Sequence, residues 1–221
     1  MRFDAVLFDC DGVLVDSEPI TNGVLRDMLE ERGWSMSRDD CMRLFIGKAV
    51  KDERAMIEAR TGQPLTPEWL AAFWERRNAA LLRDLLPIRH APEAVRAVHA
   101  AFGGHIACAS GADLHKVQLQ LRKVRLFDCF EDRIFSGHDM PRSKPAPDVY
   151  LAAAAALGAD PRRCAVVEDT VTGVTAGIAA GATVFGYNPG ELGHGSAADL
   201  LAAGACRVLT DMAQLPQALA G

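Results

Sequence analysis

The sequence has no long apolar run and no long basic run. No stretch approaches the roughly 20 consecutive apolar residues that a membrane helix needs, and residues 1–4 lack the layout of a signal peptide. The net charge is −5 at pH 7, which argues against nucleic acid or an anionic membrane as a partner. A small anionic substrate is still compatible, because a few local cations can dominate one pocket.

The six cysteines include no C-x-x-C pair, and the six histidines show no zinc-type spacing. Several cysteines stand in apolar runs, where a free thiol behaves as a small hydrophobic side chain. A chain of 221 residues is also too long to need disulfides for stability. We therefore expect reduced thiols and a cytoplasmic setting.

Length and composition favour one core domain with a smaller insertion. The chain is longer than a typical domain and short for two full ones. Its 49% hydrophobic and 24% charged residues are ordinary for a globular protein with a buried core.

The segment after the first apolar run shows only helical periodicity, broken by glycine and proline. Asp16-Ser17 can cap the first of its helices and Ser37 the second. We expect residues 17–86 to form a small helical bundle, a cap, between core segments 1–16 and 87–221. The predicted cap helices are 18–32, 37–46, 48–61 and 67–85.

Outside this segment, strand and helix patterns alternate along the chain. The predicted strands are 5–8, 105–109, 133–135, 164–167, 182–185 and 207–209, and the predicted helices are 91–101, 112–123, 147–157 and 171–180. Strands separated by helices of about ten residues indicate a parallel sheet covered on both faces. The expected fold class is α/β, a doubly wound, Rossmann-like core with an inserted helical cap.

Two aspartates, Asp9 and Asp11, follow the first strand directly. Alternate residues of a strand point the same way, so both carboxylates can converge on one point. Two anions that close repel each other, and a cation is the usual remedy. The carboxyl edge of a parallel sheet is also where ligands bind. The pair therefore suggests a magnesium-assisted site with a carboxylate nucleophile.

Three further motifs also follow predicted strands or lie close after them. Ser110-Gly111 either caps the next helix or offers a hydroxyl and backbone N–H groups to an anion. Lys144, fixed by the prolines after it, could orient a carboxylate and neutralise a phosphate. Glu168 and Asp169 could complete a magnesium shell, although Asp169 could instead cap the following helix. Together the four motifs should gather on one edge of the sheet.

Their order along the chain resembles the haloacid dehalogenase (HAD) superfamily of hydrolases, and the resemblance spans the whole chain, helical cap included. The segments that carry it are Phe8-Asp-Cys-Asp-Gly-Val-Leu-Val-Asp-Ser17, Ser110-Gly111, Ser143-Lys-Pro-Ala-Pro-Asp148 and Val167-Glu-Asp-Thr170.

The resemblance implies a role for each matching residue. Asp9 would be the nucleophile that forms an aspartyl phosphate, and Asp11 the general acid/base. Ser110 would bind the phosphoryl group and Lys144 would steady it, helped by backbone N–H groups near Cys10, Asp11 and Gly111. The Asp9 carboxylate, the Asp11 carbonyl and Asp169 would hold Mg²⁺, with Glu168 assisting directly or through water.

Within the family, the sequence favours a phosphatase. Asp11 argues against a haloacid dehalogenase, which lacks a carboxylate at this place. The rival is a sugar phosphomutase like β-phosphoglucomutase, but Thr21 stands where that branch has a cap histidine. A phosphate-binding protein without activity is a third alternative, against which the presence of Asp9, Asp11 and Lys144 argues.

The expected substrate is a small phosphorylated metabolite. The segment 135–144 looks most like the branch of bacterial 6-phosphogluconate phosphatase, which points to a sugar or sugar-acid phosphate. Specificity should lie in the cap around Gly47 and Lys48, with Arg43 or Lys51 as further candidates. The three tryptophans, Trp34, Trp69 and Trp74, are expected to pack within the cap.

Overall fold

The computed structural model describes residues 2–190 and 196–220. The chain divides into two compact units, Met1–Asp16 with Leu86–Gly221 and, between them, Ser17–Leu85. The second boundary thus lies one residue before the position expected from the sequence. Among the described residues, no helix combines the length and the apolar character that crossing a membrane requires.

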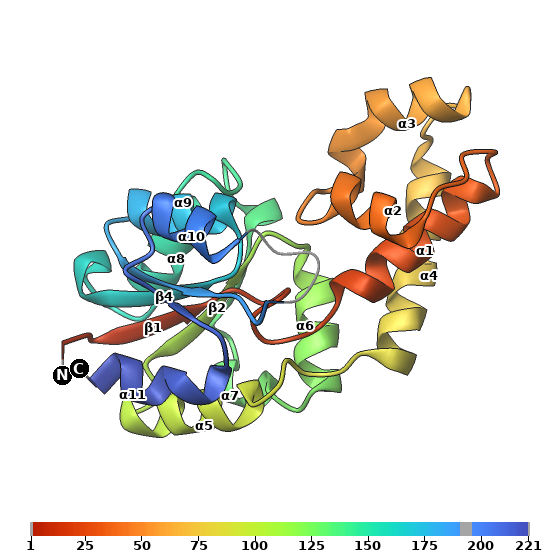
Figure 1. Ribbon diagram of the computed structural model, residues 1–221. Helices are drawn as coiled ribbons and strands as arrows, with labels where there is room; N and C mark the ends of the chain where they lie inside the picture. Colours follow the sequence, from red (N-terminus) through yellow and green to blue (C-terminus); the bar gives the residue numbers. More distant parts are fainter. Residues whose placement is uncertain (1, 191–195, 221) are drawn as a thin grey trace. The chain divides into compact units, whose positions relative to one another are not determined.

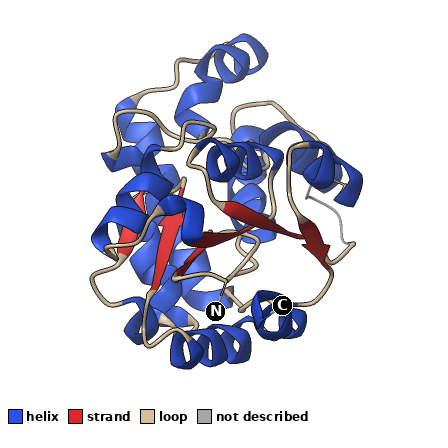
Figure 2. Ribbon diagram, turned by 90° about the vertical axis from the view of Figure 1, so that its left-hand side faces the viewer, coloured by secondary structure: helices blue, strands red, loops and turns tan. Residues whose placement is uncertain are grey.

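The larger unit is built on a six-stranded parallel sheet (Figures 1 and 2). Its strands are β1 (Ala5–Phe8), β2 (Ile106–Ser110), β3 (Ile134–Ser136), β4 (Cys164–Glu168), β5 (Thr183–Tyr187) and β6 (Arg207–Leu209). The spatial order is β3-β2-β1-β4-β5-β6. This order reverses direction between β1 and β4, the kind of place where open α/β sheets bind ligands. The predicted α/β class is confirmed.

Helices cover both faces of this sheet, with α8, α9 and α10 on one side and α5 and α11 on the other (Figure 1). The helices of the unit are α5 (Ala91–Ala101), α6 (Leu114–Lys123), α7 (Phe127–Phe130), α8 (Asp148–Ala156), α9 (Val171–Ala179), α10 (Ala197–Ala202) and α11 (Leu215–Ala220). Four strands, β1, β2, β4 and β5, are buried over nearly all their length. Their apolar composition reflects burial on both faces of the sheet.

Two kinds of difference separate the predicted core elements from the observed ones. The predicted start of the helix at residue 112 is wrong, because Asp113 caps α6 by accepting a hydrogen bond from the Lys116 N–H at 2.8 Å. Ser110 is therefore not the cap of that helix, and Thr170 rather than Asp169 caps α9. The helices α7, α10 and α11 were not predicted, because four to six residues are too few to show periodicity.

The smaller unit is all helical, with α1 (Glu18–Glu30), α2 (Arg38–Phe45), α3 (Arg54–Thr61) and α4 (Pro67–Asp84). Ser37 caps α2 as predicted, by accepting a hydrogen bond from the Asp40 N–H at 3.1 Å. The predicted cap of α1 is wrong, because the Ser17 side chain makes no capping hydrogen bond. The interior of the unit is an apolar cluster of Leu25, Met28, Leu29, Cys41, Phe45, Val50, Ile57, Leu65, Leu70 and Phe73.

Two expectations about this unit need correction. The segment predicted as one helix, 48–61, is a short 3-10 helix at Val50–Glu53 followed by α3. Trp34 and Trp69 pack against the apolar cluster as expected. Trp74, however, is 42% exposed, because it lies on the outer face of α4.

Candidate active site

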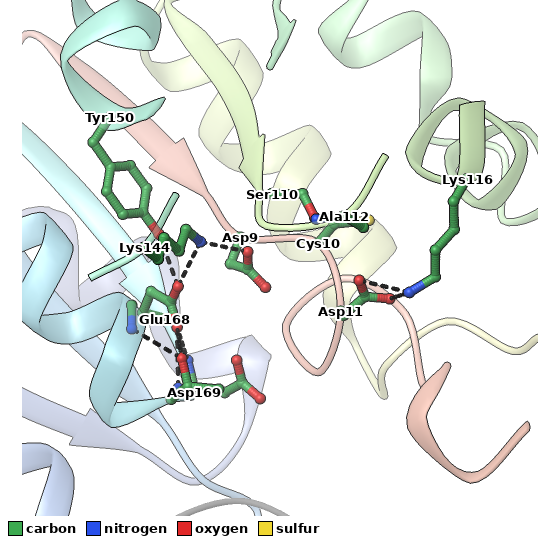
Figure 3. A network of polar contacts seen from close by, with 12 residues as sticks. Asp9, Cys10, Asp11, Ser110, Ala112, Lys116, Lys144, Tyr150, Glu168 and Asp169 are labelled. Carbon is green, nitrogen blue, oxygen red and sulfur yellow. Dashed lines mark hydrogen bonds and ion pairs between the residues drawn. The ribbon is translucent and has the colours of Figure 1, made fainter. Parts of the chain in front are cut away.

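A buried lysine joins two carboxylates at the carboxyl edge of the sheet (Figure 3). The Nζ atom of Lys144 lies 2.7 Å from Oδ1 of Asp9 and 2.7 Å from Oε1 of Glu168. Asp9 directly follows β1, and Glu168 is the last residue of the neighbouring strand β4. The side chains of Lys144, Asp9 and Glu168 are 9%, 10% and 1% exposed. Parallel pairing of β1 and β4 thus brings Asp9 close to Glu168, and the loop residue Lys144, 135 positions after Asp9, joins them.

Both carboxylate oxygens of Glu168 accept several hydrogen bonds. Its Oε1 atom accepts a second hydrogen bond, from the Tyr150 hydroxyl at 2.9 Å. Its Oε2 atom accepts hydrogen bonds from the backbone N–H groups of Asp169 and Thr170 and from the Thr170 hydroxyl, at 2.9 to 3.0 Å. A carboxylate with five donors cannot reorient without losing several hydrogen bonds, so Glu168 fixes the position of Lys144.

Burial and neighbouring charges shift the pKa values of Asp9, Lys144 and Glu168, and not all in the same direction. Burial raises the pKa of Asp9, the carboxylates of Glu168 and Asp169 raise it further, and Lys144 offsets only part of this. Burial alone would lower the pKa of Lys144, but Asp9 and Glu168 outweigh it and raise the pKa well above its ordinary value. For Glu168, Lys144 and the hydrogen-bond donors outweigh burial and lower the pKa. The site therefore carries more negative charge than its lysine neutralises.

The donor set fits a hard divalent cation. Asp9, Glu168 and Asp169 are all buried, and each offers a carboxylate oxygen within 4.8 Å of the others. Oxygen ligands of this kind suit Mg²⁺, and a cation would offset the excess negative charge. The side chain of Asp11 does not belong to this group.

The predicted convergence of the Asp9 and Asp11 side chains is wrong. Asp11 faces helix α6 instead, where the Nζ atom of Lys116 lies 2.8 and 2.9 Å from its two carboxylate oxygens (Figure 3). Gln120 Nε2 donates a further hydrogen bond at 2.8 Å. The alternation of a strand no longer applies here, because β1 ends at Phe8 and the chain turns at Gly12, which has a φ of 76°.

Ser110 ends β2, the strand that pairs with β1, and Cys10 stands two residues after the end of β1 (Figure 3). Phe8, the last residue of β1, is in register with Cys108, and Ser110 ends β2 two residues later. The Ser110 hydroxyl accepts a hydrogen bond from the Ala112 N–H at 3.0 Å, which tightens the turn through Gly111. The Cys10 side chain is fully buried, and its Sγ atom contacts Oε1 of Gln120 at 3.7 Å. Only the backbone of Cys10 is therefore suited to contact a ligand.

Gly47 and Lys48 belong to the helical unit. Gly47 has a φ of 67° and permits a tight turn after α2. The Nζ atom of Lys48 lies 3.4 Å from Oε1 of Glu53. Their part in substrate binding stays a prediction.

Comparison with known proteins identifies the family to which the chain belongs. Residues 3–181 match the family model of the haloacid dehalogenase-like hydrolases. The chain belongs to this family. The predicted family membership and the predicted class of enzyme are both confirmed.

Three relatives illustrate the similarity. The chain is 30% identical to the 6-phosphogluconate phosphatase of Escherichia coli K12 over 184 residues, which cover 83% of this chain and 82% of the relative. It is 32% identical to hexitol phosphatase B of the same organism over 179 residues, 80% and 79% of the two chains. A HAD family hydrolase from Deinococcus radiodurans R1, solved with bound phosphate and sodium, is 40% identical, with a TM-score of 0.81 over 99% of this chain and 96% of that one.

Four residues around the HAD-like site were not predicted from the sequence: Lys116, Gln120, Tyr150 and Gly173. Lys116 and Gln120 are four residues apart and so share one face of α6, but nothing in that spacing reveals which carboxylate they face. Tyr150 stands six residues after Lys144, on the first turn of α8, where an aromatic residue is also ordinary core packing. These residues become visible only when the elements are packed.

Proposed function

We propose that this protein is a magnesium-dependent phosphatase that hydrolyses a small sugar or sugar-acid phosphate through an aspartyl phosphate on Asp9. The observation that carries the proposal is the buried contact of Lys144 with both Asp9 and Glu168, at 2.7 Å each. The lysine holds one oxygen of the Asp9 carboxylate in a fixed direction. An ammonium in this place also attracts the phosphoryl oxygens of a substrate.

The first step joins Asp9 to phosphorus. A carboxylate oxygen of Asp9 attacks in line, the bond between phosphorus and the sugar oxygen breaks, and Asp11 gives a proton to that oxygen. Lys144 offsets charge on the phosphoryl oxygens while they rearrange. The Asp9 carboxylate, the Asp11 carbonyl and Asp169, with help from Glu168, would hold Mg²⁺, which would supply positive charge to the site.

The second step releases phosphate and restores the enzyme. Water attacks the phosphorus of the aspartyl phosphate, Asp11 takes a proton from that water, and the bond to Asp9 breaks. The Ser110 hydroxyl and the backbone N–H groups near Cys10, Asp11 and Gly111 bind the phosphoryl oxygens in both steps. Most of the rate acceleration comes from positioning and electrostatics.

The choice of substrate class rests on the relatives and on Asp11. Two relatives at 30% and 32% identity are named for phosphatase activity on 6-phosphogluconate and on hexitol phosphates. Asp11 supplies the proton that a sugar alkoxide needs on leaving, whereas a halide needs none. Within the cap, we assign selection among sugar phosphates to the turn at Gly47 and Lys48.

A phosphate-release assay on a panel of sugar phosphates, with 5-carbon and 6-carbon sugars, sugar acids and sugar alcohols, tests this function. We expect release of inorganic phosphate in the presence of Mg²⁺ and none above background with EDTA. No release from any member of the panel would contradict a phosphatase and favour a phosphate-binding protein without activity.

The same reactions separate a phosphatase from a sugar phosphomutase. A mutase would convert one sugar phosphate into its isomer, need a bisphosphate activator and release little phosphate. We expect dephosphorylated sugar as the product and no need for an activator, since Thr21 replaces the histidine expected of that branch. Chromatography of the products distinguishes the two outcomes.

A further inference from the structure

Helix α6 contacts the two residues that follow the nucleophile. Lys116 donates to both carboxylate oxygens of Asp11 at 2.8 and 2.9 Å, and Gln120 donates to Oδ1 at 2.8 Å. Gln120 also accepts the contact from the Cys10 thiol at 3.7 Å. Lys116 and Gln120 are 6% and 0% exposed. Because Lys116 and Gln120 lie one turn apart on the same helix face, they can contact the Cys10–Asp11 segment at the same time.

The place of Lys116 on α6 is unfavourable for a cation. It is the third residue of the helix, three positions after the Asp113 cap, and the N-terminal end of a helix carries partial positive charge. A buried lysine also loses its hydration. The bidentate ion pair with Asp11 offsets both costs. A neutral residue would suit this helix position better, so the contact with Asp11 accounts for the lysine.

The direction of the Asp11 side chain fits the geometry of phosphoryl transfer. In an in-line displacement the attacking and leaving oxygens stand on opposite sides of phosphorus. An acid that protonates the leaving oxygen must therefore stand apart from the nucleophile. Figure 3 shows the Asp9 carboxylate on the Lys144 side of the loop and the Asp11 carboxylate on the α6 side.

We propose that Lys116 and Gln120 are positioning residues that act through Asp11, holding its carboxylate on the leaving-group side of the phosphoryl site. This inference rests on the proposed phosphatase function. The two residues do not bind the phosphoryl group. Their effect is to keep the general acid separated from the nucleophile by the space that the phosphoryl group occupies.

A positioning role predicts an effect that depends on the leaving group. A sugar alkoxide must receive a proton as it leaves, whereas p-nitrophenolate is a stable anion that leaves without one. The ratio kcat/KM reports the steps up to departure of the alcohol and is insensitive to later hydrolysis of the aspartyl phosphate. Loss of Lys116 should therefore lower kcat/KM for the sugar phosphate much more than for p-nitrophenyl phosphate.

The experiment measures kcat/KM for p-nitrophenyl phosphate and for 6-phosphogluconate, or for the panel's fastest sugar phosphate if that differs. The variants are Lys116→Met, Lys116→Arg and Gln120→Leu, together with Asp11→Asn and the double variant Asp11→Asn/Lys116→Met. Lys123→Met is the matched control, because Lys123 ends the same helix and is exposed. Thermal unfolding of each variant shows whether it is folded.

We expect Lys116→Met to lower kcat/KM about tenfold more for the sugar phosphate than for p-nitrophenyl phosphate. This difference is smaller than the roughly 100-fold or more that a general acid contributes, because Asp11 itself is retained. Gln120→Leu should show a smaller effect of the same kind, and Lys116→Arg should recover most of the loss. In the Asp11→Asn background, Lys116→Met should change kcat/KM by less than about twofold, because residues that act as one unit are not additive. Lys123→Met should match the wild type.

Equal losses for the two substrates, or an undiminished effect of Lys116→Met in the Asp11→Asn background, would overturn the inference. A raised KM for both substrates would make Lys116 a phosphoryl ligand instead. These results differ from failure of the proposed function, in which the wild type itself releases no phosphate from any member of the panel.

Discussion

At the scale of single residues, the site depends on one lysine that contacts two carboxylates. Lys144 lies against the face of the Tyr150 ring, 4.7 Å from its centroid, while the hydroxyl of that ring donates to Glu168. Tyr150 thus touches both members of the Lys144–Glu168 pair. A buried ion pair is stable only when its remaining polar atoms are also satisfied, and the tyrosine contributes to this.

We therefore expect Tyr150→Phe to lower the free energy of unfolding by about 1.5–3 kcal/mol, the range for a hydrogen bond to a charged group. The ring that contacts Lys144 is retained, so the change isolates the hydroxyl. Equilibrium urea denaturation measures the difference. A variant as stable as the wild type would show that the hydroxyl does not support Glu168.

The sequence predicts which residues form the site better than it predicts where their side chains point. Asp9, Glu168 and Asp169 could be singled out because they follow recognisable strands, and Lys144 because the prolines after it fix its backbone. The direction of Asp11 could not be predicted, because it depends on a turn at Gly12 and on partners more than 100 residues away. The local sequence pattern predicts where a strand ends. The direction of a side chain beyond that end, such as Asp11, depends on how the elements pack.

At the scale of elements, α9 lies against Glu168 at a glycine. A Cβ atom placed on Gly173 would stand 1.6 Å from Oε1 of Glu168, so no larger residue fits without moving that carboxylate. A second glycine, Gly177, comes close to the sheet in the same way, with a Cβ position 2.7 Å from Val184. The small residues of α9 set how closely it approaches β4 and β5.

Gly173→Ala should displace Glu168 and with it Lys144, and a displacement of about 1 Å in a catalytic group can cost about 100-fold in rate. We expect a fall in kcat of that order together with lower stability. Phosphate-release kinetics and urea denaturation measure the two effects.

Gly23→Ala is the matched control, because Gly23 lies inside α1 with no atom within 4 Å of its Cβ position. Alanine there should stabilise the helix by about 0.5–1 kcal/mol. If Gly173→Ala were as active and as stable as Gly23→Ala, the close contact with Glu168 would not matter to the site.

Element boundaries show where sequence patterns lose information. The helix at 91–101 and the strands at 5–8 and 207–209 have the predicted bounds, since strong periodicity or a glycine marks their ends. The predicted helix 48–61 is instead a 3-10 helix followed by α3. The residues of the 3-10 helix have the composition of an α-helix, so the sequence pattern does not distinguish the two geometries. The order of the strands in the sheet has no signature in the sequence and comes from packing.

At the scale of the whole molecule, the excess negative charge of the site costs stability. The pKa of Asp9 is raised, chiefly by burial and then by neighbouring carboxylates. A carboxyl group with a raised folded pKa stabilises the fold only at low pH, and that contribution is lost as pH rises from the unfolded pKa toward the folded one. Ionisation of Asp9 in the folded protein therefore opposes folding unless a cation binds nearby.

Mg²⁺ should accordingly raise the thermal midpoint of the wild type, and a ligand at about 100 times its Kd adds about 2.7 kcal/mol. Without metal, Asp9→Asn should unfold at a higher temperature than the wild type at neutral pH, and the gap should close as pH falls toward 3.8, the ordinary pKa of an aspartate. The variant should also gain less from Mg²⁺. Scanning calorimetry with EDTA, with MgCl₂ and with NaCl of matched ionic strength tests this. Equal shifts with the two salts would contradict a specific cation site.

The central claim is that Asp9 is the nucleophile, and one comparison tests it most directly. Wild type and Asp9→Asn are mixed with the best sugar phosphate of the panel and Mg²⁺, and phosphate release is measured over many turnovers. The account predicts steady release by the wild type and no release above background by Asp9→Asn, which lacks the carboxylate that attacks phosphorus. Phosphate release at equal rates by the two proteins would contradict it.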